Sequence, residues 1–209
     1  VSPGDRVSIQ PLVSPRHDYY GKRGLYHLSP QLGCIGLSWA WGGMAEQALI
    51  KDYNAQPVPN NLTDEQGAMI EPAAVALYGV DRGGINAGST VLVSGAGPIG
   101  ALTVLAAIAA GAALVIVSEP NPNRRKIISE IAPHTVVVDP TEGKLQEVIQ
   151  DLTEEGVGVD VALECVGLEV SLNACVQAVR RQGRVVQVGL HMKPASIDAM
   201  LWALKDITV

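Results

Sequence analysis

The stretch that decides the fold is residues 90–120, TVLVSGAGPIGALTVLAAIAAGAALVIVSEP. It belongs to a longer segment, residues 83–118, that contains no Asp, Glu, Lys or Arg. A segment this apolar is typical either of a helix that crosses a membrane or of the buried centre of a globular domain. The two interpretations lead to different functions, and the internal pattern of the stretch decides between them.

The stretch is divided by the turn GAGPIG at residues 95–100. Residues 91–93 predict a strand, residues 99–110 predict a helix, and residues 114–117 predict a second strand. A membrane helix needs about 20 consecutive apolar residues, and a turn exposed to lipid would leave backbone N–H and C=O groups unpaired. The pattern therefore predicts a buried strand–helix–strand unit of a parallel sheet, and no membrane span.

The turn GAGPIG has the glycine spacing of a dinucleotide-binding loop, and it follows a strand and opens a helix, as that loop requires. We expect Gly95 to permit the tight turn, Gly97 to let the backbone approach a pyrophosphate, and Gly100 to allow close packing of helix on strand. Pro98 and Ile99 open the helix, whose free N–H groups and positive dipole end would face the phosphates.

Glu119 stands at the end of the second strand, nineteen residues after Gly100. A carboxylate there can accept hydrogen bonds from both hydroxyls of the adenosine ribose and repels a 2′-phosphate, so it favours NAD over NADP. Arg124 and Arg125 follow closely and weaken this preference slightly, and Arg124 is counted with the cofactor-binding residues. The alternative interpretation is a packing turn followed by an incidental glutamate.

Strands and helices continue to alternate downstream and predict a doubly wound α/β fold of the Rossmann type over residues 85–209. The basic pair Arg180-Arg181 falls in a helix-like pattern, and residues 207–209 open a sixth strand in which the chain stops. The further predicted strands are residues 135–139, 159–164 and 184–188, and the further predicted helices are residues 144–153, 169–180 and 200–204.

Residues 1–62 differ from the rest and predict part of a β-rich domain. The segments GDRVSIQP (residues 4–11) and GGMAEQALIK (residues 42–51) have strand-like patterns, separated by a loop rich in Tyr, Pro and Gly. A capping box, TDEQ, starts a connecting helix over residues 63–84, which Pro72 must kink or restart.

The composition limits the partners and the compartment. The net charge of −6 argues against a nucleic-acid partner, because phosphate binding needs clustered Lys and Arg. Three cysteines without CxxC spacing indicate a reducing compartment, so we expect a cytoplasmic protein. The start, VSPGDRVSIQ, has neither an initiator Met nor the apolar core of a signal peptide, which suggests a missing upstream part.

Six motifs span nearly the whole chain: GDRV, GGMAEQ, AMIEPAAVALYGV, VLVSGAGPIG, VDVALECVG and GRVVQVG. In order and spacing they resemble the zinc-dependent medium-chain alcohol dehydrogenases, in particular the polyol branch with the butanediol, sorbitol and threonine dehydrogenases. VALECVG, VVQVGLH and LKDITV look most like the bacterial 2,3-butanediol dehydrogenases. The resemblance implies a Rossmann domain plus part of a GroES-like catalytic domain, in a chain truncated at both ends.

The resemblance also implies NAD-dependent, zinc-assisted oxidation of a vicinal diol or secondary alcohol to the ketone, and we expect a homo-oligomer. The family holds its catalytic zinc with a Cys and a Gly-His-Glu segment upstream of GDRV. Neither is present, so this chain alone is expected to be inactive. The pair Glu71-Pro72 matches the polyol branch, which places Glu71 beside the catalytic zinc as a ligand or as a partner of its water. Without the resemblance, Glu71 is an ordinary helix-end carboxylate.

Two later loops complete the predicted cofactor site. Cys165 and Val166 follow the fourth strand, where the resemblance implies contact with adenine; the alternative is a buried thiol. Val188 and Gly189 end the fifth strand at the edge where open α/β sheets bind ligands, which favours contact with the nicotinamide. His191 either faces the same cleft or is an ordinary loop histidine.

In many relatives the loop that corresponds to residues 12–35 holds a structural zinc with four cysteines spaced C-x2-C-x2-C-x7-C. No matching position here is a cysteine, and one lone Asp cannot hold tetrahedral zinc, so we expect no structural zinc. The lobe would then be mobile or held by the packing of Tyr19, Tyr20 and Tyr26. The four matching positions are Pro15, Asp18, Gly21 and Ser29.

Two other functions stay open. One is a zinc-free reductase of the same fold that takes NADPH, against which Glu119 and the Glu71-Pro72 pair speak. The other is a non-catalytic dinucleotide-binding module, which the missing zinc ligands favour.

Overall fold

The strand–helix–strand unit predicted around the glycine turn is present in the computed structural model, which describes residues 1–209. Strand β5 (Thr90–Ser94) and strand β6 (Leu114–Ser118) run parallel and in register along their whole length. Helix α3 (Pro98–Ala109) connects them. Four of the five residues in each strand are buried, as the continuous apolar pattern predicts for strands covered on both faces.

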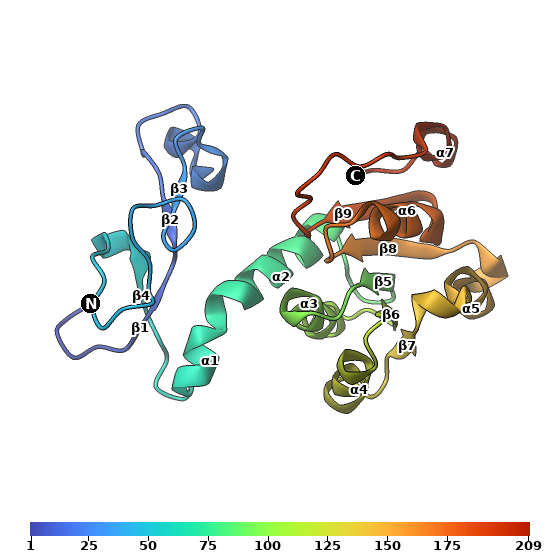
Figure 1. Cartoon of the computed structure of the whole chain (residues 1–209), viewed down its shortest axis with the longest axis horizontal. Helices are drawn as coiled ribbons and strands as arrows, with labels where there is room; N and C mark the ends of the chain where they lie inside the picture. Colours follow the sequence, from blue (N-terminus) through green and yellow to red (C-terminus); the bar gives the residue numbers. More distant parts are fainter. The chain divides into compact units, whose positions relative to one another are not determined.

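β5 lies in the middle of a five-stranded parallel sheet with the order β7-β6-β5-β8-β9 (Figure 1). The chain passes from β5 to β6 on one side and later to β8 on the other, so the strand order changes direction at β5. Ligands of open α/β sheets bind at the carboxyl ends of the strands beside such a point. The remaining strands are β7 (Val136–Val138), β8 (Val159–Glu164) and β9 (Val179–Gln187).

Helices cover both faces of this sheet, which confirms the predicted doubly wound α/β class. Alternate residues of β5 point to opposite faces. Val91 and Val93 belong to the core with α3 and α4, whereas Leu92 belongs to the core with α5 and α6. The helices are α4 (Pro122–Ile131), α5 (Leu145–Leu152), α6 (Glu169–Ala178) and α7 (Ala199–Lys205), with 3-10 turns at Pro140–Glu142 and Glu154–Gly156.

Helix α6 ends earlier than the sequence pattern predicts. Its last residue is Ala178, and both Arg180 and Arg181 lie in β9, so the prediction of a helical basic pair is wrong. The reason is that the buried Val179 pairs with Val159 at the start of β8 instead of continuing the helix.

The predicted sixth strand is represented by one isolated parallel bridge, between Arg184 and Thr208. Val185 N donates to Thr208 O at 2.8 Å, and Thr208 N donates to Gly183 O at 3.2 Å. Residues 207–209 therefore begin to pair along β9 without forming a full strand.

The sheet belongs to one compact unit, Pro72–Val209, and the residues before it form another, Val1–Glu71. The first unit contains two short antiparallel pairs, which the buried Asn54 joins by donating from Nδ2 to Gln10 O and Leu12 O. Residues 42–51, predicted as a strand, form none and are mostly exposed. The pairs are β1 (Val7–Ile9) with β4 (Ala55–Pro57) and β2 (Leu12–Val13) with β3 (Gly33–Cys34), and 3-10 turns lie at Gly21–Arg23, Tyr26–Leu28 and Asp52–Asn54.

The predicted connecting helix is two helices, α1 (Asp64–Ala68) and α2 (Ile70–Gly83). The capping box is present, because Gln66 N donates to Thr63 Oγ1 and Thr63 N donates to Gln66 Oε1. Pro72 lies in the first turn of α2, where its missing N–H removes no helical hydrogen bond, so the helix restarts there. No helix has both the length and the apolar character that a membrane crossing would need.

Candidate functional site

The carboxyl ends of the three central strands lie at one level, because Ser94 of β5 is opposite both Ser118 of β6 and Glu164 of β8. The loops after these strands therefore gather at one edge of the sheet, at the point where the strand order changes. The loop after β9 joins them, since Val188 N and Gly189 N donate to Glu164 O at 2.9 and 2.8 Å. The predicted cofactor-binding residues lie on these loops or at the start of α3, except Arg124, which lies in the first turn of α4.

Two of the three glycines in the turn are required by the backbone geometry. Gly95 has a φ of +94°, and a Cβ there would lie 2.6 Å from Val166 Cγ2. A Cβ at Gly100 would overlap the carbonyl oxygen of Gly95. Glycine at both positions therefore lets the chain turn tightly and lets α3 pack closely on the end of β5, as predicted.

Gly97 differs from the other two because the space above it is open. A Cβ there would meet one atom within 4 Å, Arg124 Nη1 at 3.9 Å. Gly97 is also the N-cap of α3, and it has no side chain that could cap the first N–H groups of the helix. Gly97 therefore borders an open space that is lined by uncapped N–H groups, the positive end of the helix dipole and a guanidinium group. A pyrophosphate fits this space by charge and by hydrogen bonding.

The Glu119 side chain ties the end of β6 to the glycine turn. Glu119 is 2% exposed; its Oε2 accepts from Ala96 N at 2.7 Å and its Oε1 accepts from Asn121 N at 2.8 Å. Each carboxylate oxygen has a further lone pair, so these bonds leave capacity to accept from ribose hydroxyls. The bond to Ala96 was not predicted, because nothing in the spacing of the motif indicates it.

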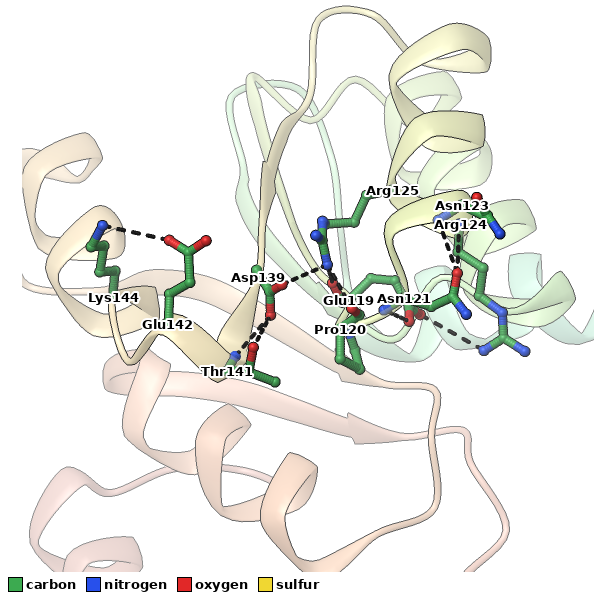
Figure 2. Close-up of polar contacts among 10 residues, drawn as sticks. All are labelled: Glu119, Pro120, Asn121, Asn123, Arg124, Arg125, Asp139, Thr141, Glu142 and Lys144. Carbon is green, nitrogen blue, oxygen red and sulfur yellow. Dashed lines mark hydrogen bonds and ion pairs between the residues drawn. The ribbon is translucent and has the colours of Figure 1, made fainter.

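The two arginines that follow Glu119 have different surroundings (Figure 2). Arg125 Nη1 forms an ion pair with Asp139 Oδ2 at 2.8 Å and donates to Glu119 O at 3.0 Å. Hydrogen bonds from Thr141, together with the charge of Arg125, lower the pKa of Asp139. Arg124 Nη1 lies 3.9 Å from Glu119 Oε2, and its side chain is 53% exposed. Arg124, and not Arg125, is therefore the arginine available to a ligand at the turn.

The loop after β8 meets the glycine turn through its first two residues. Burial raises the pKa of the Cys165 thiol to about 12, so the thiol stays protonated and is not a nucleophile at neutral pH. Val166 covers Gly95 and is 42% exposed. Of this predicted pair, Val166 offers the larger surface to a ligand, and Cys165 contributes to the core.

Glu164 was missed by the sequence analysis. It is 0% exposed, and it accepts hydrogen bonds from its own loop and from Gln187 at the end of β9. The available signal was a charged residue that closes the otherwise apolar end of β8. His191 lies near it, with a buried Nε2 that has no hydrogen-bond partner and is 3.7 Å from Glu164 Oε2.

Glu71 lies at a cleft of about 340 Å³ within the unit Val1–Glu71. Arg6 and Asp64 also line this cleft and form an ion pair at 2.7 Å. Burial, with a contribution from the negative charge of Glu71, raises the pKa of Cys34.

No group of three or more His, Cys, Asp or Glu side chains in the chain could hold a metal ion. The residues of this chain therefore do not form a zinc site by themselves.

Asp18 links three of the four positions that correspond to structural-zinc ligands. Its Oδ1 accepts from Gly21 N at 2.6 Å and its Oδ2 accepts from Ser29 Oγ at 2.7 Å. The fourth position is also close, since a Cβ at Gly21 would lie 2.5 Å from Pro15 O. The bonds from Gly21 and Ser29 lower the pKa of Asp18. A carboxylate with hydrogen bonds thus connects the positions at which the resemblance implies zinc-binding cysteines in relatives.

Of the three tyrosines predicted to hold this lobe, Tyr19 packs edge-on against Tyr20 with ring centroids 5.2 Å apart, and Tyr19 and Tyr26 each contact an arginine. Arg16 lies 4.5 Å from the ring centroid of Tyr26 and 4.2 Å from that of Tyr53. Arg23 lies 3.7 Å from the ring centroid of Tyr19. Cation–π contacts of this kind add stability to an exposed loop.

Known proteins resemble the whole chain. (R,R)-Butanediol dehydrogenase of Bacillus subtilis (strain 168) is 36% identical over 207 residues, which cover 99% of this chain and 58% of that protein. Sorbitol dehydrogenase of Homo sapiens is 33% identical over 210 residues, which cover 100% of this chain and 58% of that protein. The chain thus spans little more than half the length of these relatives.

The fold comparison agrees with the sequence comparison. A structure described as a zinc-binding dehydrogenase from Sinorhizobium meliloti 1021, solved with NADP bound, matches with a TM-score of 0.91 and 32% identity, covering 100% of this chain and 61% of that one. The family model described as "Zinc-binding dehydrogenase" matches residues 98–209, which begin at the first residue of α3. The chain belongs to the zinc-binding dehydrogenase family.

Proposed function

We propose that this chain contains the dinucleotide-binding domain of an NAD-dependent dehydrogenase that oxidises a vicinal diol or secondary alcohol to the ketone. The relatives with 36% and 33% identity are a butanediol and a sorbitol dehydrogenase, which supports a small alcohol or polyol as the substrate. The observation that carries the cofactor assignment is the Glu119 carboxylate, held beside the glycine turn by Ala96 N.

The preference for NAD rests on the charges around Glu119. A 2′-phosphate on the adenosine ribose would approach a buried carboxylate whose position two backbone bonds fix. Arg124 could offset this repulsion, but it lies 3.9 Å from the same carboxylate and is already attracted to it. The negative charge therefore decides the preference.

Zinc dependence belongs to the proposal for the whole protein. A bound zinc ion would polarise the alcohol oxygen. Within this chain the resemblance assigns Glu71 alone to that site. The residues that act in this chain are those that bind and orient the dinucleotide: the glycine turn with Arg124 at the pyrophosphate, Glu119 at the adenosine ribose, and the loops after β8 and β9 at the bases.

A zinc-free reductase that takes NADPH is the second candidate; the structural relative with bound NADP supports its cofactor, although that relative is described as a zinc-binding dehydrogenase. The test is a turnover assay of the whole protein with butane-2,3-diol and sorbitol, with NAD⁺ or NADP⁺, before and after chelation of metal. We expect oxidation of the diols with NAD⁺ that is lost on chelation and restored by zinc. Turnover with NADP⁺ that survives chelation would contradict the proposal and favour the reductase.

A further inference from the structure

Glu164, the last residue of β8, is a buried carboxylate that hydrogen-bonds its own loop and helix α6. Its Oε1 accepts from Val166 N at 2.9 Å, from Gly167 N at 2.9 Å and from Ser171 Oγ at 2.6 Å. Its Oε2 accepts from Gly167 N at 3.1 Å. A charged group can remain buried when donors of this number surround it.

Gln187, the last residue of β9, connects the same carboxylate to the neighbouring loop. Its Nε2 donates to Glu164 Oε2 at 2.7 Å and to Gly189 O at 2.6 Å, so the two amide hydrogens join the two groups. A Cβ at Gly189 would lie 2.8 Å from Glu164 Oε2 and would overlap Gly167 N. The loop after β9 is therefore packed directly against the loop after β8, and the Gln187 side chain adds a polar link to the backbone bonds from Val188 N and Gly189 N to Glu164 O.

His191 approaches the carboxylate without completing a bond. The distance from its Nε2 to Glu164 Oε2 is 3.7 Å, which is too long for a hydrogen bond. Of the two side chains near this carboxylate from β9 and its loop, Gln187 is thus the one that hydrogen-bonds both Glu164 and Gly189, beside the backbone bond from Gly189 N to Glu164 O.

We propose that Gln187 is a positioning residue that fixes the loop at residues 188–190 for the nicotinamide end of the dinucleotide. The inference rests on the proposed function, since it takes the dinucleotide as the ligand. Glu119 lies beyond the β6 side of the glycine turn and Gln187 beyond its β8 side, so a dinucleotide whose adenosine end lies at Glu119 extends its other end toward β8 and β9. The Gln187 link therefore acts on one end of the ligand only.

The wild type and three variants test this positioning role. Gln187→Met keeps the length of the side chain and removes both donated bonds, whereas Gln187→Lys keeps a donor. Ser171→Ala is the matched control, because it removes a donor to the same Glu164 carboxylate from α6 and leaves the β9 loop untouched. Each form, with the wild type, is titrated calorimetrically with NADH and with ADP-ribose, which lacks the nicotinamide.

We expect Q187M to weaken NADH binding by about three- to tenfold, which is comparable to the net contribution of one hydrogen bond. Its ADP-ribose affinity should stay within about twofold, Q187K should recover most of the NADH affinity, and S171A should leave the ratio of the two affinities unchanged.

An unchanged ratio of the NADH and ADP-ribose affinities in Q187M would overturn the inference, as would a shift of this ratio in S171A as large as that in Q187M. So would a Q187M chain without a cooperative thermal transition, since Gln187 would then be a folding residue. A wild-type chain that binds neither ligand would overturn the proposed function and this inference together, whereas equal wild-type affinities for both ligands would overturn the inference alone.

Discussion

Gly97 and Gly100 belong to the same turn but should respond differently to one added methyl group. The Cβ of Gly97→Ala enters open space and that of Gly100→Ala overlaps the Gly95 carbonyl oxygen. We expect G100A to lower the free energy of unfolding by about 1–3 kcal/mol or more, as overpacking does. G97A should fold as the wild type does and lose about tenfold or more in NADH affinity, because its methyl group fills the space proposed for the pyrophosphate.

Thermal unfolding and calorimetric titration of the two variants check this difference. A G97A chain that binds NADH as tightly as the wild type would contradict the pyrophosphate site. A G100A chain of wild-type stability would contradict the close approach of α3 to β5.

Glu119 should contribute both to stability and to cofactor choice. In Glu119→Ala the N–H groups of Ala96 and Asn121 lose their acceptor, so we expect a loss of about 1–3 kcal/mol in the free energy of unfolding. The preference for NADH over NADPH should shrink in the same variant. Arg124→Ala is the control: its side chain is 53% exposed and its ion pair with Glu119 is long, at 3.9 Å, so stability should change by less than about 1 kcal/mol. Full retention of the NADH preference in E119A would show that Glu119 does not select the cofactor.

At the scale of elements, Asp160 links three strands at the amino edge of the sheet. Its carboxylate accepts from Thr90 N and Thr90 Oγ1 of β5, both at 2.8 Å, and from Arg180 Nε of β9 at 2.7 Å. Burial raises the pKa of Asp160, but the bonds from Thr90 and Arg180 outweigh it and hold the pKa below the ordinary value of 3.8. The carboxylate therefore stabilises the fold above pH 3.8, and this contribution is lost as the pH falls through the lowered pKa.

Asp160→Asn should accordingly be less stable than the wild type at neutral pH, and the difference should shrink below about pH 4. Chemical denaturation at a series of pH values measures it. Asp151→Asn, which removes an exposed carboxylate of α5, controls for the general effect of one charge. A constant difference between wild type and D160N from neutral pH down to pH 3 would show that the ionised Asp160 carboxylate does not stabilise the fold.

The carboxylate of Asp18 should stabilise the lobe of residues 12–35, as that of Asp160 stabilises the sheet. Asp18→Ala removes the acceptor for Gly21 N and Ser29 Oγ, so we expect faster proteolytic cleavage within the lobe and an unchanged second unit. Asp5→Ala, an exposed carboxylate elsewhere in the first unit, is the control. Equal cleavage of both variants would show that Asp18 does not hold the lobe.

At the scale of the whole molecule, the sheet was predictable because strands buried on both faces leave continuous apolar runs between turns. The glycine turn was predictable because its backbone demands are local. The hydrogen bonds that Glu119 and Glu164 accept from neighbouring segments could not be predicted, because they depend on which strands become neighbours in the sheet. The end of α6 was predicted wrongly for a related reason. Val179 could continue the helix or begin a strand, and its pairing with Val159 of β8 places it in a strand.

The first unit was harder to predict than the second because its elements are short. Its strands have two or three residues each, too few to show a clear alternation. The segment 42–51 has a strand-like pattern and remains unpaired, so pattern alone was misleading there. The lobe shows the same limit, because the link from Asp18 to Ser29 spans eleven residues of irregular chain.

We propose that the turn at Gly97, with Glu119 beside it, binds NAD in preference to NADP. Calorimetric titration of the chain with NADH and, separately, with NADPH measures this preference. We expect saturable NADH binding that is about tenfold or more tighter than NADPH binding, a difference of about 1.4 kcal/mol or more. Tighter binding of NADPH would contradict the role of Glu119, and binding of neither nucleotide would contradict the turn as a cofactor site.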